Sequence, residues 1–96
     1  MIKAHVPPEL FELAKAYLSK RIAELPGLND AVTQGRYEEI LASTHKVKGT
    51  AAPYGLERLG ELAHQLELAA KSQDSGLGHS ILKQIDEYLK NVEITL

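Results

Sequence analysis

The residues with the clearest capacity for chemistry lie in one short segment around His45. Lys48 and Gly49 stand three and four positions after it. On a helix these positions neighbour His45 on the same surface. A histidine ring nitrogen can act as a nucleophile, and a lysine beside it can stabilise an anion held on the ring. The three residues therefore indicate an exposed, nucleophilic histidine with an anion-stabilising cation next to it.

Gly49 strengthens this interpretation, because glycine is a poor residue for the interior of a helix. It costs about 1 kcal/mol relative to alanine at such a position. At the fourth position after His45 it removes a side chain that would crowd the ring, so that another protein could approach. The simpler alternative is a surface histidine on a helix with a weak point. Spacing alone leaves both interpretations open.

Residues 36–52 have the pattern of an amphipathic helix, on which His45 lies at the edge of the buried side. The inward positions repeat at three- and four-residue spacing. They are Tyr37, Ile40, Thr44, Val47 and Ala51. Glu38 and Glu39 suit the positive end of the helix dipole. Pro53 ends the helix, since the residue before a proline is disfavoured in the α conformation.

The rest of the chain predicts further helices joined by short connections. The first begins near residue 8 and ends near Leu25, because Pro26-Gly27 is a strong stop signal. A brief helix over residues 28–34 precedes the histidine helix. Two more helices follow the histidine helix and are separated by a loop; the helices cover residues 56–71 and about 77–92, and the loop covers residues 72–78. Both ends of the chain, His5 and residues 93–96 included, are expected to fray.

These elements predict an all-α fold. Short connections make consecutive helices antiparallel, which gives an up-down-up-down four-helix bundle with an additional short helix before the His-bearing helix. The chain has 96 residues, 44% of them hydrophobic. That length fits a single helical bundle domain over residues 1–96.

Composition excludes several classes of function. The net charge is −2, from 11 basic and 13 acidic residues, which gives no footprint for nucleic acid or a membrane surface. No apolar run approaches the roughly 18 residues of a membrane span. The chain has no cysteine, which excludes a disulfide framework and thiol chemistry. We expect a monomeric cytoplasmic protein.

Metal-dependent chemistry is also disfavoured. Glu61 and His64 stand three positions apart, as in one half of a carboxylate-bridged di-metal bundle, but the sequence has no second such pair. A zinc site needs three or four converging ligands, so we predict no metal site. Glu67 lies at the edge of an apolar face, where it either accepts a hydrogen bond across the bundle or is solvated. His64 and Gln65 could border the His45 surface.

Together these residues resemble a histidine-containing phosphotransfer (HPt) domain of two-component phosphorelay signalling. The similarity extends from about residue 8 to residue 89. It rests on His45-x-x-Lys48-Gly49, Tyr54-Gly55, Leu59 and Leu66-Glu67-x-Ala69-Ala70. In one departure, Gly35-Arg36 stands where many members carry Gly-Asp before the histidine helix. That difference changes a helix start and leaves the phosphate site untouched.

The resemblance implies a phosphoryl carrier that lacks ATP binding and autonomous kinase activity. His45 would accept a phosphoryl group from the phosphoaspartate of a response regulator receiver domain, or pass it to one, and a hybrid histidine kinase is the other implied partner. Lys48 would stabilise the phosphate, and Gly49 would give access to the imidazole. The chain itself would hold no cofactor, because Mg²⁺ belongs to the receiver. The implied docking residues are Leu41, Ala42, Lys46, Ala52 and Gln65.

A second class of function stays open. A helical interaction module could use the same surface to dock or sequester a receiver domain or another partner without being phosphorylated. The combination of His45, Lys48 and Gly49 favours the carrier, because a pure binding module does not need all three.

Overall fold

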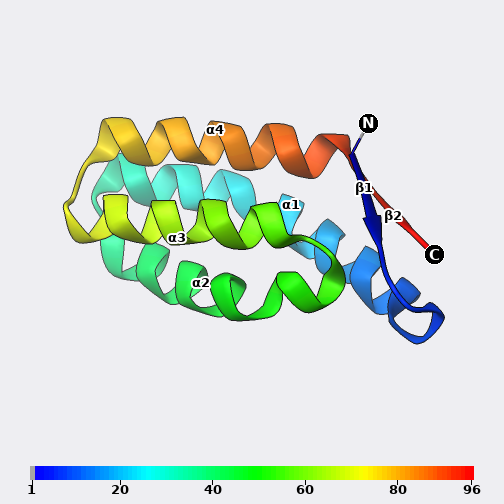
Figure 1. The fold of residues 1–96 in the computed structure, drawn as a ribbon. Coiled ribbons are helices and arrows are strands. Elements are labelled where there is room, and N and C mark those ends of the chain that lie inside the picture. Colours follow the sequence, from blue (N-terminus) through cyan, green and yellow to red (C-terminus); the bar gives the residue numbers. More distant parts are fainter. Residues whose placement is uncertain (1) are drawn as a thin grey trace.

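The computed structural model describes residues 2–96, and in them four α-helices pack along one another (Figure 1). The helices are α1 (Phe11–Gln34), α2 (Tyr37–Thr50), α3 (Glu57–Lys71) and α4 (Ser75–Asn91). A 3-10 turn, Pro8–Leu10, precedes α1, and a second one, Ala52–Tyr54, follows α2. The colour gradient in Figure 1 reverses direction from each helix to the next. The predicted helical fold class is confirmed.

The apolar stripes of the four helices meet in one core. Each helix contributes buried side chains at the helical spacing that the sequence shows. The largest fully buried side chains are Ile40, Leu56, Leu62, Leu66, Ile81, Leu82, Leu89 and Val32. At Gly60 a Cβ would lie 3.8 Å from the Cβ of Ala51 and 3.9 Å from the carbonyl oxygen of Lys48, which are ordinary contact distances, so the packing of α3 on α2 would also accept alanine here.

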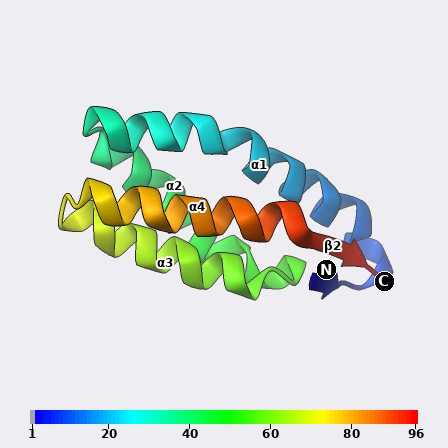
Figure 2. The same ribbon diagram turned by 90° about the horizontal axis from the view of Figure 1, so that it is seen from above.

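The prediction that a helix ends near Leu25 was wrong. Helix α1 continues through Pro26, so residues 28–34 form its last turns and are not a separate short helix. A proline inside a helix costs about 3 kcal/mol. Leu25 and Val32 are buried on either side of it, and burial of a large apolar side chain contributes about 1.5–3 kcal/mol, which offsets that cost. Figure 2 shows α1 bending part-way along its length, as a proline inside a helix causes.

The two ends of the described chain do not fray but pair with each other. Strands β1 (Ile2–His5) and β2 (Val92–Thr95) form a two-stranded parallel sheet, visible at one end of the bundle in Figure 1. Ala4 lies opposite Ile94, and both side chains are buried. The prediction of frayed ends failed because the paired strands lie far apart in the sequence, where no local pattern connects them.

Gly35 and Arg36 form the turn between α1 and α2. Gly35 ends α1 with a φ of 73°, a left-handed conformation that favours glycine. The Arg36 guanidinium donates to a carboxylate oxygen of Asp30 at 2.9 Å and also to Glu39. These two hydrogen bonds raise the pKa of Arg36, and the bond to Asp30 has the larger effect. Arg36 therefore joins the end of α1 to the start of α2.

The connection between α3 and α4 is shorter than the predicted loop. The Asp74 carboxylate accepts a hydrogen bond from the backbone N–H of Leu77 at 3.0 Å and caps α4, which begins at Ser75. Gly76 and Gly78 are therefore helical. At Gly78 a Cβ would lie 3.2 Å from a Val32 methyl group, so the glycine lets α4 approach α1 closely.

Candidate functional site

Helix α2 places His45 on the outside of the bundle. Thr44 and Val47 on either side of it are buried, as predicted, and this turns the imidazole outward. The ring is exposed. No hydrogen bond or ion pair from any residue of the range 2–96 engages its nitrogens. An exposed imidazole without a partner is free to meet an incoming electrophile.

Lys48, one turn after His45, reaches across to α3. Its Nζ donates a hydrogen bond to Oε1 of Glu67 at 2.9 Å. The Lys48 side chain is 38% exposed, whereas the Glu67 side chain is only 9% exposed. Of the two possibilities for Glu67, the structure shows the hydrogen bond across the bundle. The pair holds the ammonium group beside the surface of α2 while leaving part of it open to solvent.

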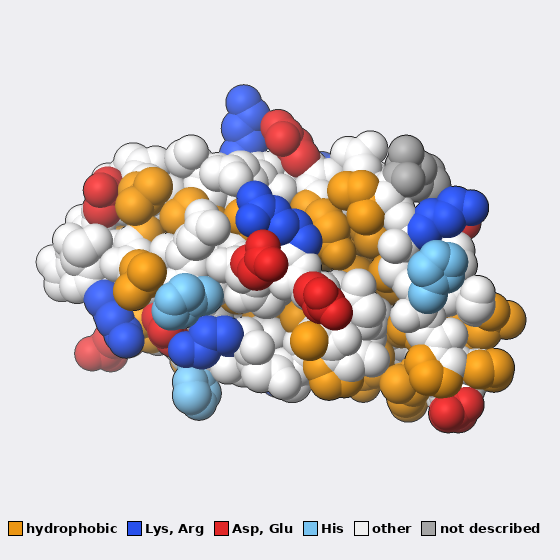
Figure 3. Space-filling model, viewed as in Figure 1, with side chains coloured by type: hydrophobic (Ala, Val, Ile, Leu, Met, Phe, Trp, Pro, Cys, Tyr) orange, Lys and Arg blue, Asp and Glu red, His pale blue; other side chains and the backbone are white. Residues whose placement is uncertain are grey.

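Glu67 is also surrounded by positive side chains from its own helix. Its Oε1 lies 3.8 Å from Nδ1 of His64 and 3.9 Å from Nζ of Lys71. The hydrogen bond from Lys48 lowers the pKa of the Glu67 carboxyl, against the opposing effect of burial, and the nearby charges act in the same direction as the hydrogen bond. Figure 3 shows histidine side chains beside basic side chains on the face that α2 and α3 form, and acidic side chains elsewhere on the same face. Around Glu67 the two ammonium groups of Lys48 and Lys71 outweigh the single carboxylate, which favours a negatively charged partner at this part of the face.

Gly49 borders open space. A Cβ at this position would meet no atom within 4 Å, and its φ is not in the left-handed region. Gly55 is different, since it has a φ of 76° and a Cβ there would lie 3.1 Å from the carbonyl oxygen of His5. The fold therefore requires glycine at Gly55 but not at Gly49. Packing among the described residues therefore does not explain the glycine at position 49.

A comparison with protein-family models matches residues 9–94 to the Hpt domain. The match includes all of α2 and α3 and every residue of the site described above. The chain belongs to the Hpt domain family. Hpt domains carry phosphoryl groups in phosphorelay signalling, lack autonomous kinase activity, and interact with receiver domains and histidine kinases. No curated protein and no solved structure matched the chain.

Residues 2–96 contain neither a helix that could span a membrane nor a cluster of metal-binding side chains. Across the described helices, none combines the length and the apolar character that a bilayer crossing requires. In residues 2–96, no three histidine, cysteine or carboxylate side chains gather in a way that could hold a metal ion. Glu61 forms an ion pair with Arg58 at 3.1 Å, and Nδ1 of His64 faces Glu67.

The predicted docking residues of the Hpt domain lie on different parts of the surface. Leu41 is half-buried against the core, Ala52 is exposed in the 3-10 turn after α2, and Gln65 is exposed on α3. Ala42 and Lys46 are exposed too, but they line a groove between α2 and α1. The structure thus places these two on the α1 side of α2, whereas Lys48 points to α3.

Two features of α3 were missed by the sequence analysis. Lys71 joins the charges around Glu67, and its spacing of four residues from Glu67 was a signal that could have found it. Leu68 follows Glu67 and is 52% exposed, which adds apolar surface beside the charged cluster. The helical spacing was a signal for this exposure, because at about 100° per residue Leu68 lies on the side of α3 opposite Leu59 and Leu66.

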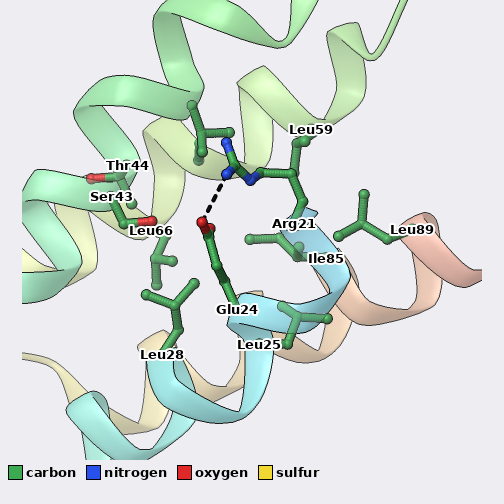
Figure 4. Close-up of a pocket in the computed structure, with 12 residues that line it drawn as sticks. Arg21, Glu24, Leu25, Leu28, Ser43, Thr44, Leu59, Leu66, Ile85 and Leu89 are labelled. Atoms are coloured by element: carbon green, nitrogen blue, oxygen red, sulfur yellow. Dashed lines mark hydrogen bonds and ion pairs between the residues drawn. The ribbon is translucent and has the colours of Figure 1, made fainter. Parts of the chain in front are cut away.

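A small cavity inside the bundle is separate from the His45 surface. It has a volume of about 30 Å³, and its lining includes residues of all four helices (Figure 4). Its polar lining residues are Arg21, Glu24, Ser43 and Thr44, and the first two are joined by the hydrogen bond drawn in Figure 4. A volume of this size accommodates about one water molecule. Neither His45 nor Lys48 lines it, so the candidate chemistry belongs to the outer surface.

Proposed function

We propose that His45 is the phosphoacceptor of this Hpt domain. In this role the chain accepts a phosphoryl group from a receiver-domain phosphoaspartate, or passes one back. The observation that carries the proposal is the exposed, unengaged imidazole of His45 one turn before a lysine whose ammonium group is held by Glu67. A ring nitrogen of neutral imidazole carries a free lone pair, so it can attack without a separate base.

The other histidines are less suited, each for its own reason. Both ring nitrogens of His79 have a contact, Nε2 with Thr33 Oγ1 at 3.1 Å and Nδ1 with Asn29 Oδ1 at 3.3 Å, so a phosphoryl group would have to displace one of them. At His64 the carboxylate of Glu67 lies 3.8 Å from Nδ1 and would repel a phosphoryl group on the ring. His5 lies in strand β1, outside residues 9–94 that match the family.

In the proposed reaction a ring nitrogen of His45, Nε2 by similarity to the family, attacks the phosphorus of the phosphoaspartate in line. The N–P bond forms as the P–O bond to the aspartate breaks, and the aspartate leaves as a carboxylate. The transition state spreads negative charge over the equatorial phosphoryl oxygens. Lys48 would stabilise that charge, and the receiver would supply Mg²⁺. Transfer back to a receiver runs through the same steps in reverse.

Glu67 has a supporting role in this proposal. Its carboxylate is held ionised by the hydrogen bond from Lys48 and by the neighbouring charges. Because Glu67 is buried and Lys48 is partly exposed, the hydrogen bond restricts the lysine without covering it. The ammonium group is therefore already oriented before a receiver docks.

The receiver would dock over the outer surface of α2 and α3. Gly49 leaves room beside His45, and the exposed Leu68 adds an apolar contact to the predicted docking residues. Of those predicted residues, Leu41, Ala52 and Gln65 lie on α2, the turn after it and α3, whereas Ala42 and Lys46 lie on the α1 side of α2, so a receiver that uses all five must reach across α2. Lys46 and Lys71 would complement an acidic receiver surface, which would speed association most at low salt.

Intact-mass measurement after mixing with a panel of phosphorylated receiver domains and Mg²⁺ tests the proposal. The wild type should gain one acid-labile phosphoryl group, and His45→Gln should gain none while still binding the receiver. His64→Gln, which changes a neighbouring exposed histidine, is the matched control and should still be phosphorylated. A gain that persists in His45→Gln would contradict the proposal. Equal binding by wild type and His45→Gln without phosphorylation of either would favour the interaction module.

A further inference from the structure

We propose that Tyr17 is a positioning residue for the phosphoacceptor segment of α2. Its hydroxyl group braces the last turn of α2 against α1, on the side of the helix opposite Glu67. The consequence for phosphotransfer rests on the proposed role of His45, whereas the brace itself can be measured without any phosphorylation.

The direction of the hydrogen bonds identifies Tyr17 as a donor. The Oγ1 of Thr50 donates to the carbonyl oxygen of Lys46 at 2.9 Å. Thr50 has a single hydroxyl hydrogen, so it must accept in its other contact, which lies 2.7 Å from the Tyr17 hydroxyl oxygen. The chain of bonds runs from Tyr17 through Thr50 to the carbonyl oxygen of Lys46, the residue after His45. Consecutive hydrogen bonds of this kind polarise and strengthen one another.

The Tyr17 ring is itself held from two sides. The Arg21 guanidinium carbon lies 4.7 Å from its centroid, and the Tyr54 ring lies 4.8 Å away, centroid to centroid. Arg21 is fixed in turn, because it is buried and its Nη2 donates to Glu24 at 2.7 Å. Tyr54 belongs to the 3-10 turn that follows α2. The phenol therefore presents its hydroxyl in one orientation.

The braced turn contains Gly49, and no side chain from the rest of the bundle packs against that position. Glycine in a helix loses more conformational freedom on folding than other residues, so this turn opens more readily than one built of alanine. Tyr17 on one side of α2 and the Lys48–Glu67 pair on the other side keep this turn in its helical position. Without the Tyr17 bond, Lys48 would be less firmly fixed relative to His45.

Amide hydrogen exchange of residues 47–51 and the rate of transfer from a phosphorylated receiver test the inference together. Tyr17→Phe keeps the ring and its contacts but removes the hydroxyl. We expect about fivefold faster exchange of these amides, the size of effect that one lost hydrogen bond produces. The maximal transfer rate should also fall, by about threefold to fivefold, because the loss is again that of one hydrogen bond. The receiver concentration that gives half of the maximal rate should not change.

Matched variants separate the hydroxyl from the general packing of the ring. Tyr54→Phe removes a hydroxyl from the same ring pair, one that has no hydrogen-bond partner among residues 2–96, and should change neither readout. Thr50→Val should reproduce the effect of Tyr17→Phe, and Thr50→Ser, which keeps a hydroxyl, should restore both readouts. The double variant Tyr17→Phe/Thr50→Val should be no worse than Thr50→Val alone.

Two results would overturn the inference. If the amides of residues 47–51 exchange at the same rate in Tyr17→Phe and Tyr54→Phe, the brace does not exist. If Tyr17→Phe exchanges faster but reaches the wild-type maximal transfer rate, the brace does not position the site. If no receiver phosphorylates the wild type, the proposed function of His45 fails, and the exchange comparison still decides for or against the brace.

Discussion

Two ion pairs of the bundle, Arg21–Glu24 and Lys48–Glu67, are buried in opposite ways. In the first, both partners belong to α1, and the cation is the buried member: the Arg21 side chain is 4% exposed and that of Glu24 is 35% exposed. In the second, which joins α2 to α3, the carboxylate is buried and the cation is partly open to solvent. The first pair turns its positive charge inward, and the second turns it outward.

The difference shows how one kind of interaction can serve two purposes. Arg21 directs its charge into the bundle, where its Nε is buried without a hydrogen-bond partner and its guanidinium packs on the Tyr17 ring. That charge cannot reach a ligand at the surface. Lys48 keeps its charge near the surface, one turn from His45, while the buried Glu67 limits its movement. We therefore assign Arg21–Glu24 to packing and Lys48–Glu67 to the proposed chemistry.

The largest effect on transfer is expected from Lys48→Met, which removes the outward charge but keeps much of the side-chain volume. Loss of one group that stabilises transition-state charge lowers rates by about 100-fold in enclosed sites, and partial exposure should reduce this to about 10- to 100-fold. The measurement is the single-turnover rate of transfer from a phosphorylated receiver. Lys83→Met, at an exposed lysine on α4, is the control and should change the rate less than threefold. Equal transfer rates for the two variants would contradict the role assigned to the charge of Lys48.

Substitutions in the Arg21–Glu24 pair should lower the free energy of unfolding more than the other substitutions proposed. Glu24→Gln leaves the Arg21 cation buried without a counter-charge and should destabilise the bundle by about 2 kcal/mol, less than for a fully buried pair because Glu24 is partly exposed. Arg21→Met removes both the charge and its unpartnered Nε, so it should cost less. Urea unfolding measures both variants. A larger loss for Arg21→Met than for Glu24→Gln would contradict this account of the pair.

Gly49→Ala should change stability and activity in opposite directions. Alanine should stabilise α2 by up to about 1 kcal/mol, because a Cβ there meets no atom within 4 Å. The added methyl group should slow transfer severalfold by crowding the approach to His45. Gly27→Ala on α1 is the matched control, since a Cβ there also meets nothing, and it should stabilise without slowing transfer. A wild-type rate for Gly49→Ala would show that the open space is not used.

The smallest effect concerns pH and the buried carboxyl of Glu67. Its pKa is lowered in the folded state, first by the hydrogen bond from Lys48, so ionised Glu67 stabilises the fold above the ordinary carboxyl range. That contribution is lost as the pH falls through the lowered pKa. The difference in urea midpoint between wild type and Glu67→Gln should therefore be largest near pH 7 and shrink below about pH 4.

A control for the pH experiment is available on the same helix. Glu61 forms an exposed ion pair with Arg58, so Glu61→Gln should differ little from wild type at any pH. A gap between wild type and Glu67→Gln that stays constant from pH 7 to pH 3 would show that the Lys48–Glu67 hydrogen bond does not depend on the charge of Glu67.

The parts of the fold that the sequence predicted are those set by local signals. The helix that carries His45 and the next one were foreseen with nearly their observed bounds, because Pro53 and Gly55 separate them and their apolar positions repeat at helical spacing. Pro26 was misread because a local stop signal competes with the burial of Leu25 and Val32, which depends on the other helices. The β1–β2 pairing joins the two ends of the chain, and the spacing of apolar residues within a segment does not predict such a contact.

In the candidate site, too, residues close in the sequence could be predicted, whereas contacts between helices could not. His45, Lys48 and Gly49 lie within five residues, so their spacing alone suggested a common purpose. The partner of Lys48 could not be derived in this way, because Glu67 lies 19 positions away on another helix. A charged residue at the edge of an apolar face was a sign that a partner was needed, but only the packing of α2 on α3 identifies it. The docking residues remain predictions.

The most direct test of the account is the NMR spectrum of the ¹⁵N-labelled protein after phosphorylation by a receiver. We expect one phosphohistidine signal, with the phosphorus coupled to Nε2 of His45, together with a shift of the Lys48 ammonium signal as its contact with Glu67 is shared with the phosphoryl group. Coupling of the phosphorus to His5, His64 or His79, or its attachment to a residue other than histidine, would contradict the central claim that His45 is the phosphoacceptor.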